Sequence, residues 1–172
     1  MAQEPLITED YRHQNAIFHE QNKWYGANGG RYAEHVYGLL ASFHPETVLD
    51  YGCGKGGLRA TVEDLIKRRR PAQPKLSRNK SGRHRMMGVT MPEWTMYDPS
   101  IPGLDSYPEG KFDLVVCTDV LEHVEPQFIT STLDELWKMT GKVALLTFAL
   151  RESNKTLPDG RNTHLIKLAL WI

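Results

Sequence analysis

The sequence has few cysteines, no long apolar run and no surplus of charge. Its 172 residues include 2 cysteines, Cys53 and Cys117, which do not form the C-x-x-C spacing of a zinc or redox site. The histidines also lack the spacing of a metal site, so we predict no bound metal. No apolar stretch approaches the ~20 residues of a membrane-spanning helix, and residues 1–10 lack a signal-peptide core. We therefore expect a soluble, cytoplasmic protein with reduced thiols and no membrane contact.

The charges balance overall but are unevenly distributed. Lys and Arg number 21, as do Asp and Glu, so the whole chain does not imply a polyanionic partner. Residues 67–85, however, are rich in Lys and Arg and contain no acid. Such a segment buries little and repels itself, so we predict an exposed basic loop inserted at about 67–92. The loop could contact nucleic acid or another anionic partner, or be solvated and bind nothing; its lack of aromatic residues favours the second interpretation.

Short apolar runs alternate with helix-like stretches along the chain. The expected strands are Val48–Tyr51, Trp94–Tyr97, Phe112–Cys117 and Lys142–Phe148, and the expected helices cover residues 32–40, 58–67 and 128–139. This order predicts a single α/β domain over residues 1–172. We expect a mainly parallel sheet with helices on both faces and a ligand at the carboxyl ends of its strands.

The expected sheet is short. Residues 98–111 are too few for a further helix and strand, and nothing after Thr163 has the pattern of an antiparallel hairpin. We expect residues 164–172 to form one short helix or an apolar tail. Such an ending suggests a partner, a core contact or a chain cut short.

The sequence VLDYGCGKG at residues 48–56 is the most informative motif. A buried strand ends near Asp50, and glycines at alternate positions then form a tight turn before a helix. The G-x-G-x-G loop is one residue shorter than the dinucleotide fingerprint, and it lacks the G-K-[ST] ending of a P-loop. An acid before the loop would also repel a pyrophosphate. A carboxylate beside bare glycine amides suits a zwitterionic ligand better than a polyanion.

Two later motifs combine with the glycine loop to indicate a family. They are WTMYDPS at residues 94–100 and FDLVVCTDVLEHV at residues 112–124. In this order, the three motifs resemble those of the class I S-adenosylmethionine-dependent methyltransferases, and the third is common among small-molecule methyltransferases. The resemblance implies a Rossmann-like fold, shortened relative to the full seven-stranded one, with S-adenosyl-L-methionine as cofactor.

The same resemblance assigns roles to individual residues. Asp50 would hold the amino group of the methionine moiety, directly or through water, and Asp98 would accept hydrogen bonds from the ribose hydroxyls. An N-terminal segment would fold over the cofactor, and residues after the third strand would line the adenine and methyl-transfer end. The residues expected to contact the cofactor are Tyr25, Gly26, Asp50, Gly52, Cys53, Gly54, Gly56, Asp98, Pro99, Thr118, Asp119 and Val120.

A general base would be needed for a hydroxyl or amine acceptor. His123 is the catalytic residue that we predict, because a histidine has a suitable pKa and the resemblance places it near the methyl group. Asp119 is also close by, but histidines in LEHV segments often pack within the fold instead. His19, Tyr25 and His164 are weaker candidates, and we expect Glu122 to support the loop.

The methyl acceptor is not identified by a motif. The chain lacks the [DNS]-P-P-[YFW] motif of amino-methylating DNA enzymes, and Cys117 does not follow a proline as the cytosine-C5 nucleophile does. We therefore favour a small-molecule acceptor. An RNA, DNA or protein acceptor reached through the basic loop is the alternative enzyme function, and a non-catalytic cofactor-binding module is the alternative of another class.

Overall fold

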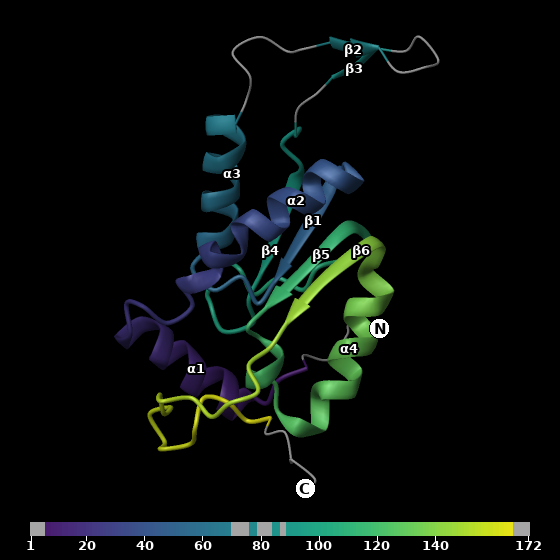
Figure 1. Cartoon of the computed structure of the whole chain (residues 1–172). Coiled ribbons are helices and arrows are strands. Elements are labelled where there is room, and N and C mark those ends of the chain that lie inside the picture. The colour runs from purple at the N-terminus through teal and green to yellow at the C-terminus, as the bar shows by residue number, and fades with distance from the viewer. Residues whose placement is uncertain (1–5, 70–75, 79–83, 87–88, 167–172) are drawn as a thin grey trace, which may run out of the picture.

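A computed structural model describes residues 6–69, 76–78, 84–86 and 89–166 (Figure 1). Its main sheet has the strand order β4-β1-β5-β6, and every pairing in it is parallel. The strands are β1 (Thr47–Tyr51), β4 (Glu93–Tyr97), β5 (Phe112–Thr118) and β6 (Thr140–Thr147). The α/β fold with a parallel sheet is thus confirmed, and the four expected strands are present with small differences at their ends.

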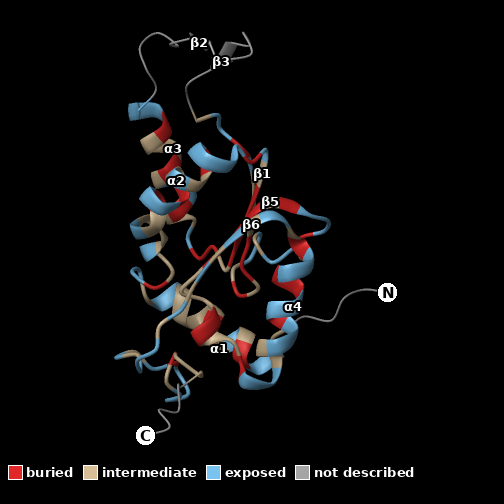
Figure 2. Cartoon of the chain, turned by 45° about the vertical axis from the view of Figure 1, so that its right-hand side comes forward, coloured by how far each residue is buried: buried red, intermediate tan, exposed pale blue. Residues whose placement is uncertain are grey.

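Helices cover both faces of this sheet. Helices α2 (Ala33–Phe43) and α3 (Gly57–Arg69) pack against one face, where Val48 and Val116 are fully buried. Helix α4 (Ile129–Met139) packs against the other, where Leu49 and Val115 are fully buried. Figure 2 shows β1 and β5 as the most buried strands, which explains their continuous apolar sequences. Among the described residues, no helix has the length and hydrophobicity to cross a membrane.

The N-terminal helix α1 (Glu9–Gln21) was not expected from the sequence. Thr8 caps it by accepting a hydrogen bond from the Tyr11 amide at 3.2 Å. Thr8 also donates its own amide and hydroxyl hydrogens to the Glu125 carboxylate, at 2.7 and 2.9 Å. Glu125 immediately precedes the short helix η3 (Pro126–Phe128). These bonds fix the start of α1 near the carboxyl ends of the strands (Figure 1).

The connections between strands create a crevice at one end of the sheet. The chain passes from β1 through α3 to β4, and from β5 through η2 (Leu121–His123), η3 and α4 to β6. Helices α3 and α4 lie on opposite faces, so the chain leaves the adjacent strands β1 and β5 in opposite directions. This is the topological switch point at which ligands bind in open α/β sheets. Residues 98–111 contain turns but no helix or strand, as expected.

The basic insertion differs from the expected loop. Helix α3 continues to Arg69, and ion pairs one helical turn apart, such as Arg68 with Asp64, stabilise its last turns. Strands β2 (Leu76–Arg78) and β3 (His84–Met86) form an antiparallel pair within the insertion (Figure 1). The prediction of a loop throughout 67–92 was therefore wrong in these parts. The rest of the basic run, and residues 167–172 of the expected tail, lie outside the described residues.

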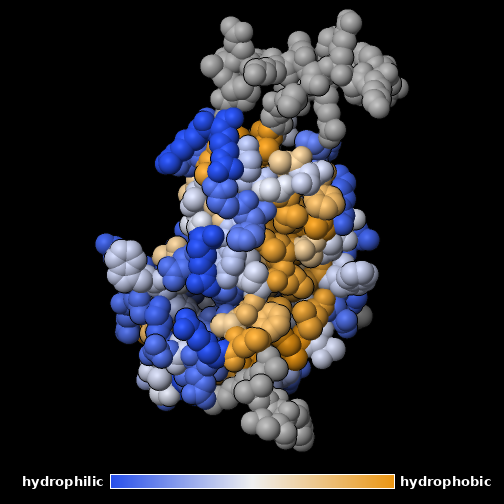
Figure 3. Space-filling model, viewed as in Figure 1, coloured by the Kyte–Doolittle hydropathy of each residue, from blue (hydrophilic) through white to orange (hydrophobic). Residues whose placement is uncertain are grey.

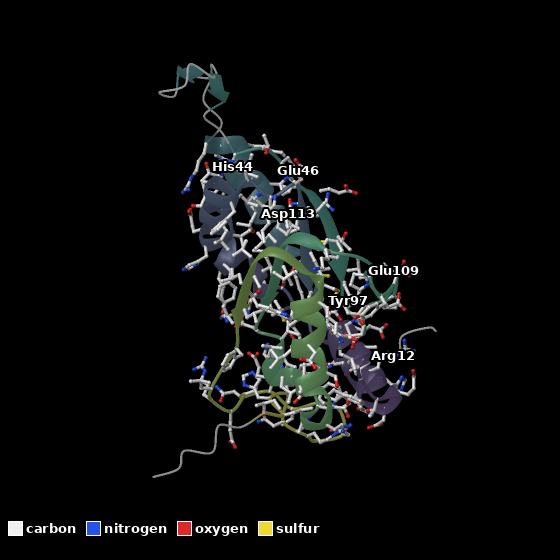
Figure 4. The ribbon with its side chains drawn as sticks, turned by 90° about the vertical axis from the view of Figure 1, so that its right-hand side faces the viewer. Arg12, His44, Glu46, Tyr97, Glu109 and Asp113 are labelled. Atoms are coloured by element: carbon white, nitrogen blue, oxygen red, sulfur yellow. The ribbon has the colours of Figure 1, made fainter. Side chains whose placement is uncertain are left out.

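A second set of polar contacts aligns the opposite end of the sheet. The Asp113 carboxylate accepts hydrogen bonds from the Glu46 amide at 2.8 Å and from Lys142 Nζ at 2.9 Å. The Glu46 amide and Lys142 lower the pKa of Asp113 below its usual value. Figure 4 shows Glu46 and Asp113 together at this end, with Arg12 of α1 at the other. Asp113 of β5 therefore links the start of β1 and the start of β6 at the end of the sheet opposite the crevice.

The sheet ends at β6, which pairs with β5 alone among the described residues. Figure 3 shows a hydrophobic stripe on this side of the molecule. Large apolar side chains are exposed on β6 and just after it, namely those of Leu146, Phe148 and Leu150. The described part of the chain therefore leaves an apolar sheet edge facing solvent.

We predict that Leu114→Ala lowers the free energy of unfolding by about 2–5 kcal/mol, because it leaves a cavity where a fully buried side chain packed. Leu133→Ala on α4 is the matched control, since that leucine is 41% exposed and should lose under ~1 kcal/mol. Urea unfolding followed by circular dichroism measures both values. Equal losses for the two variants would contradict the position of the core.

Candidate functional site

The crevice at the carboxyl ends of β1 and β5 opens into a cavity of about 400 Å³. This volume lies in the range of small-molecule sites, about 300–1,000 Å³. Its walls come from the glycine loop after β1, the loop after β5, the N-terminal region and the segment after β6. His123 and every residue expected to contact the cofactor line the cavity, with the exception of Gly56. Gly56 lies just before α3 and faces the Met96 side chain of β4 instead.

The glycine loop can approach its neighbours closely only because it lacks side chains. Gly52 and Gly54 have positive φ angles of 73° and 52°, which favour glycine. A Cβ atom on Gly52 would lie 2.3 Å from Val120 Cγ2, and one on Gly54 would lie 2.3 Å from the Gly26 carbonyl oxygen. The two glycines thus allow the loop after β5 and the N-terminal region to meet at the cavity.

The amides of this loop are already hydrogen-bonded, in contrast to the bare amides expected from the sequence. The Gly52 and Cys53 amides donate to the Tyr97 carbonyl oxygen at 2.7 and 3.0 Å. The Gly54 amide donates to Asp98 Oδ2 at 3.0 Å. The loop therefore binds the end of β4 and offers a ligand bare backbone surface, with these three donors engaged within the protein.

Two buried carboxylates face the cavity. Asp50 is 2% exposed, and its Oδ2 atom has no hydrogen-bond partner. Burial, followed by the nearby Asp98, raises the pKa of Asp50 to about 7. Burial also raises the pKa of Asp98, although hydrogen bonds from the Ser100 and Gly54 amides oppose this effect. A ligand with a cationic group and hydroxyl donors fits these two acids.

The N-terminal region closes one side of the cavity. The Lys55 amide donates to the Gly26 carbonyl oxygen at 2.8 Å, and Lys55 Nζ donates to that of Asn22 at 2.8 Å. The buried Tyr25 donates its hydroxyl hydrogen to Asn15 Oδ1 at 3.1 Å. The Tyr25 ring also lies edge-on to His123, with ring centroids 5.9 Å apart. The expected segment over the site is therefore present, and helix η1 (Asn28–Tyr32) follows it.

Asp119 is held by this N-terminal region. Its carboxylate accepts a hydrogen bond from the Tyr32 hydroxyl at 2.6 Å and forms an ion pair with Arg31. Its backbone has a positive φ of 55°, and its amide donates to the Thr147 carbonyl oxygen at 3.0 Å. Because a cation already neutralises this carboxylate, Asp119 is poorly placed to serve as a base. Thr118 and Val120 beside it line the cavity.

Glu122 supports the loop after β5, as expected from the sequence. It is 2% exposed, its Oε1 accepts a hydrogen bond from the Ala149 amide at 3.0 Å, and its carbonyl oxygen accepts one from the Leu165 amide at 2.7 Å. These bonds hold the segment after β6 against the loop. Residues 149, 151–155 and 163–164 of that segment form a cavity wall, of which the sequence analysis named only His164 as a site candidate.

His123 is a weaker base than the sequence suggested. Burial lowers its pKa to about 4, and the nearby His164 also lowers it. The ring is therefore neutral at pH 7, with Nδ1 hydrogen-bonded to the Thr163 carbonyl oxygen. His19 has its pKa lowered to about 4 in the same way, chiefly by burial. A role for His123 as general base stays a prediction.

Comparisons with known proteins find one family for this chain. A family described as "Methyltransferase domain" matches residues 25–167. Among solved structures, the chain resembles the N-methyltransferase NodS from Bradyrhizobium japonicum WM9 in complex with S-adenosyl-L-homocysteine. The identity is 14% and the TM-score 0.38, over 77% of this chain and 69% of that one. A search of curated proteins finds no significant match.

We predict that Asp50 destabilises the fold as the pH rises. Its folded pKa of about 7 exceeds the ordinary aspartate pKa of 3.8, so the native state holds a proton that the unfolded state releases between these two pH values. Stability from this group is fully present below about pH 4 and is lost by about pH 7. Relative to Asp50→Asn, the parent should lose on the order of 3 kcal/mol over this range. Urea unfolding at pH 4.5 and 7.5 measures the difference, and parallel behaviour of the two proteins would refute the raised pKa.

Proposed function

This chain belongs to the methyltransferase domain family, and we propose that it transfers a methyl group from S-adenosyl-L-methionine to a small-molecule acceptor. S-adenosyl-L-methionine is the cofactor and supplies a sulfonium-bound methyl group that is already activated toward nucleophiles. The observation that carries the proposal is the buried, unpartnered carboxylate oxygen of Asp50 beside the glycine loop. This oxygen atom can accept a hydrogen bond from a cationic amino group of a ligand in the cavity.

The two acids would bind opposite parts of the cofactor. Asp50 Oδ2 is free to accept hydrogen bonds from the amino group, either directly or through water. Each oxygen of Asp98 accepts one backbone hydrogen bond and keeps a lone pair for a ribose hydroxyl. The glycine loop between them lets the ligand lie against backbone. The residues after β5, from Thr118 to Val120, would then line the adenine and methyl-transfer end.

The protein's contribution to the reaction is mainly to position the acceptor and exclude water. Tyr25 and the N-terminal segment around it, which Lys55 Nζ holds through a hydrogen bond to the Asn22 carbonyl oxygen, cover the cavity beside the glycine loop. An acceptor held in line with the methyl group needs little further activation, unless a proton must leave. His123 is then the candidate to accept that proton, because its Nε2 carries a lone pair when the ring is neutral.

The position of the basic insertion favours a small-molecule acceptor. The insertion follows α3, which has 13 residues and therefore spans about 20 Å. Since α3 begins at the glycine loop, its basic end lies at the other pole of the domain (Figure 1). A partner bound at that pole would have to extend over this distance to reach the cavity.

Two alternatives follow from the same chain. An RNA, DNA or protein acceptor would use the basic insertion, and a binding module would hold the cofactor without turnover. We favour the small-molecule enzyme because the charged pole and the cavity are separate. The two cysteines, which are free and buried, support a cytoplasmic location.

We predict that Asp50→Asn and Asp98→Asn each weaken binding of S-adenosyl-L-homocysteine by about 1–3 kcal/mol, because each removes a charged hydrogen-bond acceptor. Isothermal titration calorimetry on the purified chain measures the affinities. Asp134→Asn, on the exposed side of α4, is the matched control and should bind like the parent. If both site variants also bind like the parent, the cofactor lies elsewhere.

We further predict that removal of residues 70–88 leaves cofactor affinity unchanged and keeps methyl transfer to a small acceptor. The reason is that the insertion extends from the far end of α3, about one helix length from the glycine loop. A screen of small hydroxyl and amine compounds, read out by formation of S-adenosylhomocysteine, identifies the acceptor. Turnover on RNA that is lost with the deletion would favour the nucleic-acid alternative, and cofactor binding without turnover on any acceptor would favour the binding module.

A further inference from the structure

The structure brings together three possible metal ligands that lie far apart in the sequence. Glu122 and His123 belong to η2, whereas His164 lies in the segment after β6. One ligand atom from each of the three side chains lies within 4.8 Å of the other two. All three residues also line the cavity. This grouping arises because the Leu165 and Ile166 amides donate to the Glu122 carbonyl oxygen, at 2.7 and 3.2 Å, and return the segment to η2.

Both histidines are oriented in the way that metal-binding histidines usually are. His123 Nδ1 is hydrogen-bonded to the Thr163 carbonyl oxygen, and His164 Nδ1 to that of Arg151 at 2.6 Å. Because a carbonyl oxygen can only accept, each Nδ1 carries a hydrogen, and the neutral ring has its lone pair on Nε2. Backbone carbonyls fix metal-binding histidines in this tautomer. The two ring centroids are 4.9 Å apart.

Glu122 supplies an independent reason to expect a cation. Its Oε1 atom is bonded to the Ala149 amide, but its Oε2 atom is buried without a partner. Leaving a buried carboxylate oxygen unsatisfied is costly. Burial accordingly raises the pKa of Glu122. A metal ion beside this oxygen would satisfy it.

We propose that Glu122 Oε2, His123 Nε2 and His164 Nε2 form a binding site for a divalent transition-metal ion, foremost Zn²⁺. Two imidazoles and one carboxylate are a donor set that suits this class of ion. Three protein ligands also leave a coordination position open toward the cavity, as in catalytic zinc sites. The spacing of these residues in the sequence gives no signal of the site.

The geometry requires a contraction on binding. Ligand atoms around a tetrahedral ion with bonds of about 2.1 Å are separated by about 3.4 Å, so the three ligand atoms, which lie within 4.8 Å of one another, must draw together. The irregular segment that carries His164 allows this movement. Two charged side chains near His123 act on its pKa in opposite directions: Asp119 raises it and Lys155 lowers it. Lys155 is placed by its ammonium, which lies 5.5 Å from the Tyr25 ring centroid. The effects of these two charges on a bound cation therefore partly cancel.

This site gives His123 a different role from that of a general base. The Nε2 lone pair can bind a metal ion or accept a proton, but it cannot do both at once. A metal ion bound here would instead hold an oxygen or nitrogen of the acceptor at its open coordination position. That consequence rests on the proposed function, whereas binding of the ion does not.

The test is calorimetric titration of the full chain, freed of metal with a chelator and dialysed, with ZnCl₂ at pH 7.5. The parent should bind one equivalent with micromolar affinity or better. His164→Ala and Glu122→Gln should each weaken binding at least ~10-fold. Glu122→Gln keeps the oxygen that accepts from Ala149, and His164 is partly exposed in an irregular segment, so both variants should fold.

The matched control is His13→Ala, which removes an exposed histidine from α1 and should bind zinc like the parent. Thermal unfolding checks that each variant is folded. Absence of zinc binding by the parent, or parent-like binding by both site variants, would overturn the proposal. Titration of the metal-free chain with S-adenosylhomocysteine separates the two hypotheses: cofactor binding without zinc binding rejects only the metal site, and the reverse rejects only the proposed function.

Discussion

The site depends on the burial of two carboxylates at the ends of the neighbouring strands β1 and β4. Asp50 and Asp98 are both buried and line the same cavity, and like charges repel each other strongly where burial removes the solvent. The Gly54 and Ser100 amides donate hydrogen bonds to Asp98 and stabilise its charge. Gly54 can do so only in a turn without side chains. Asp50 Oδ2 has no such partner, so the fold favours a ligand that brings a positive charge to this acid.

Two further buried acids join the distant parts of the chain into the cavity wall. Glu125 binds Thr8 at the start of α1, and Glu122 binds the segment that follows β6. The loop after β5 thereby connects the N-terminal and C-terminal regions. This arrangement explains how a four-stranded sheet comes to have a walled cavity. The walls that the sheet does not supply include helix α1 and the irregular segment after β6, which are held by hydrogen bonds to these carboxylates.

Sequence patterns predicted the parts of the structure that depend on local order. The four strands, the glycine turn and the placement of Asp50 and Asp98 follow from apolar runs that end in an acid. Helix α1 was missed even though Thr8, followed by Glu9 and Asp10, is a typical helix start. The pKa of His123 could not be foreseen, because burial by other segments lowers it. The meeting of Glu122 with His164 is likewise a tertiary contact, formed through an irregular segment that has no periodic signal.

The basic run illustrates why charge in a sequence is weak evidence for a nucleic-acid partner. Lys67, Arg68 and Arg69 occupy the last turn of α3, where positive charge is favourable beside the helix dipole. Arg68 pairs with Asp64, and Arg69 pairs with Glu34. These described residues thus have a structural reason to be basic. Because they also lie about one helix length from the glycine loop, their charge acts at one pole and the methyl-transfer chemistry at the other. A large polyanionic acceptor would have to bridge both poles, whereas a small acceptor needs only the cavity.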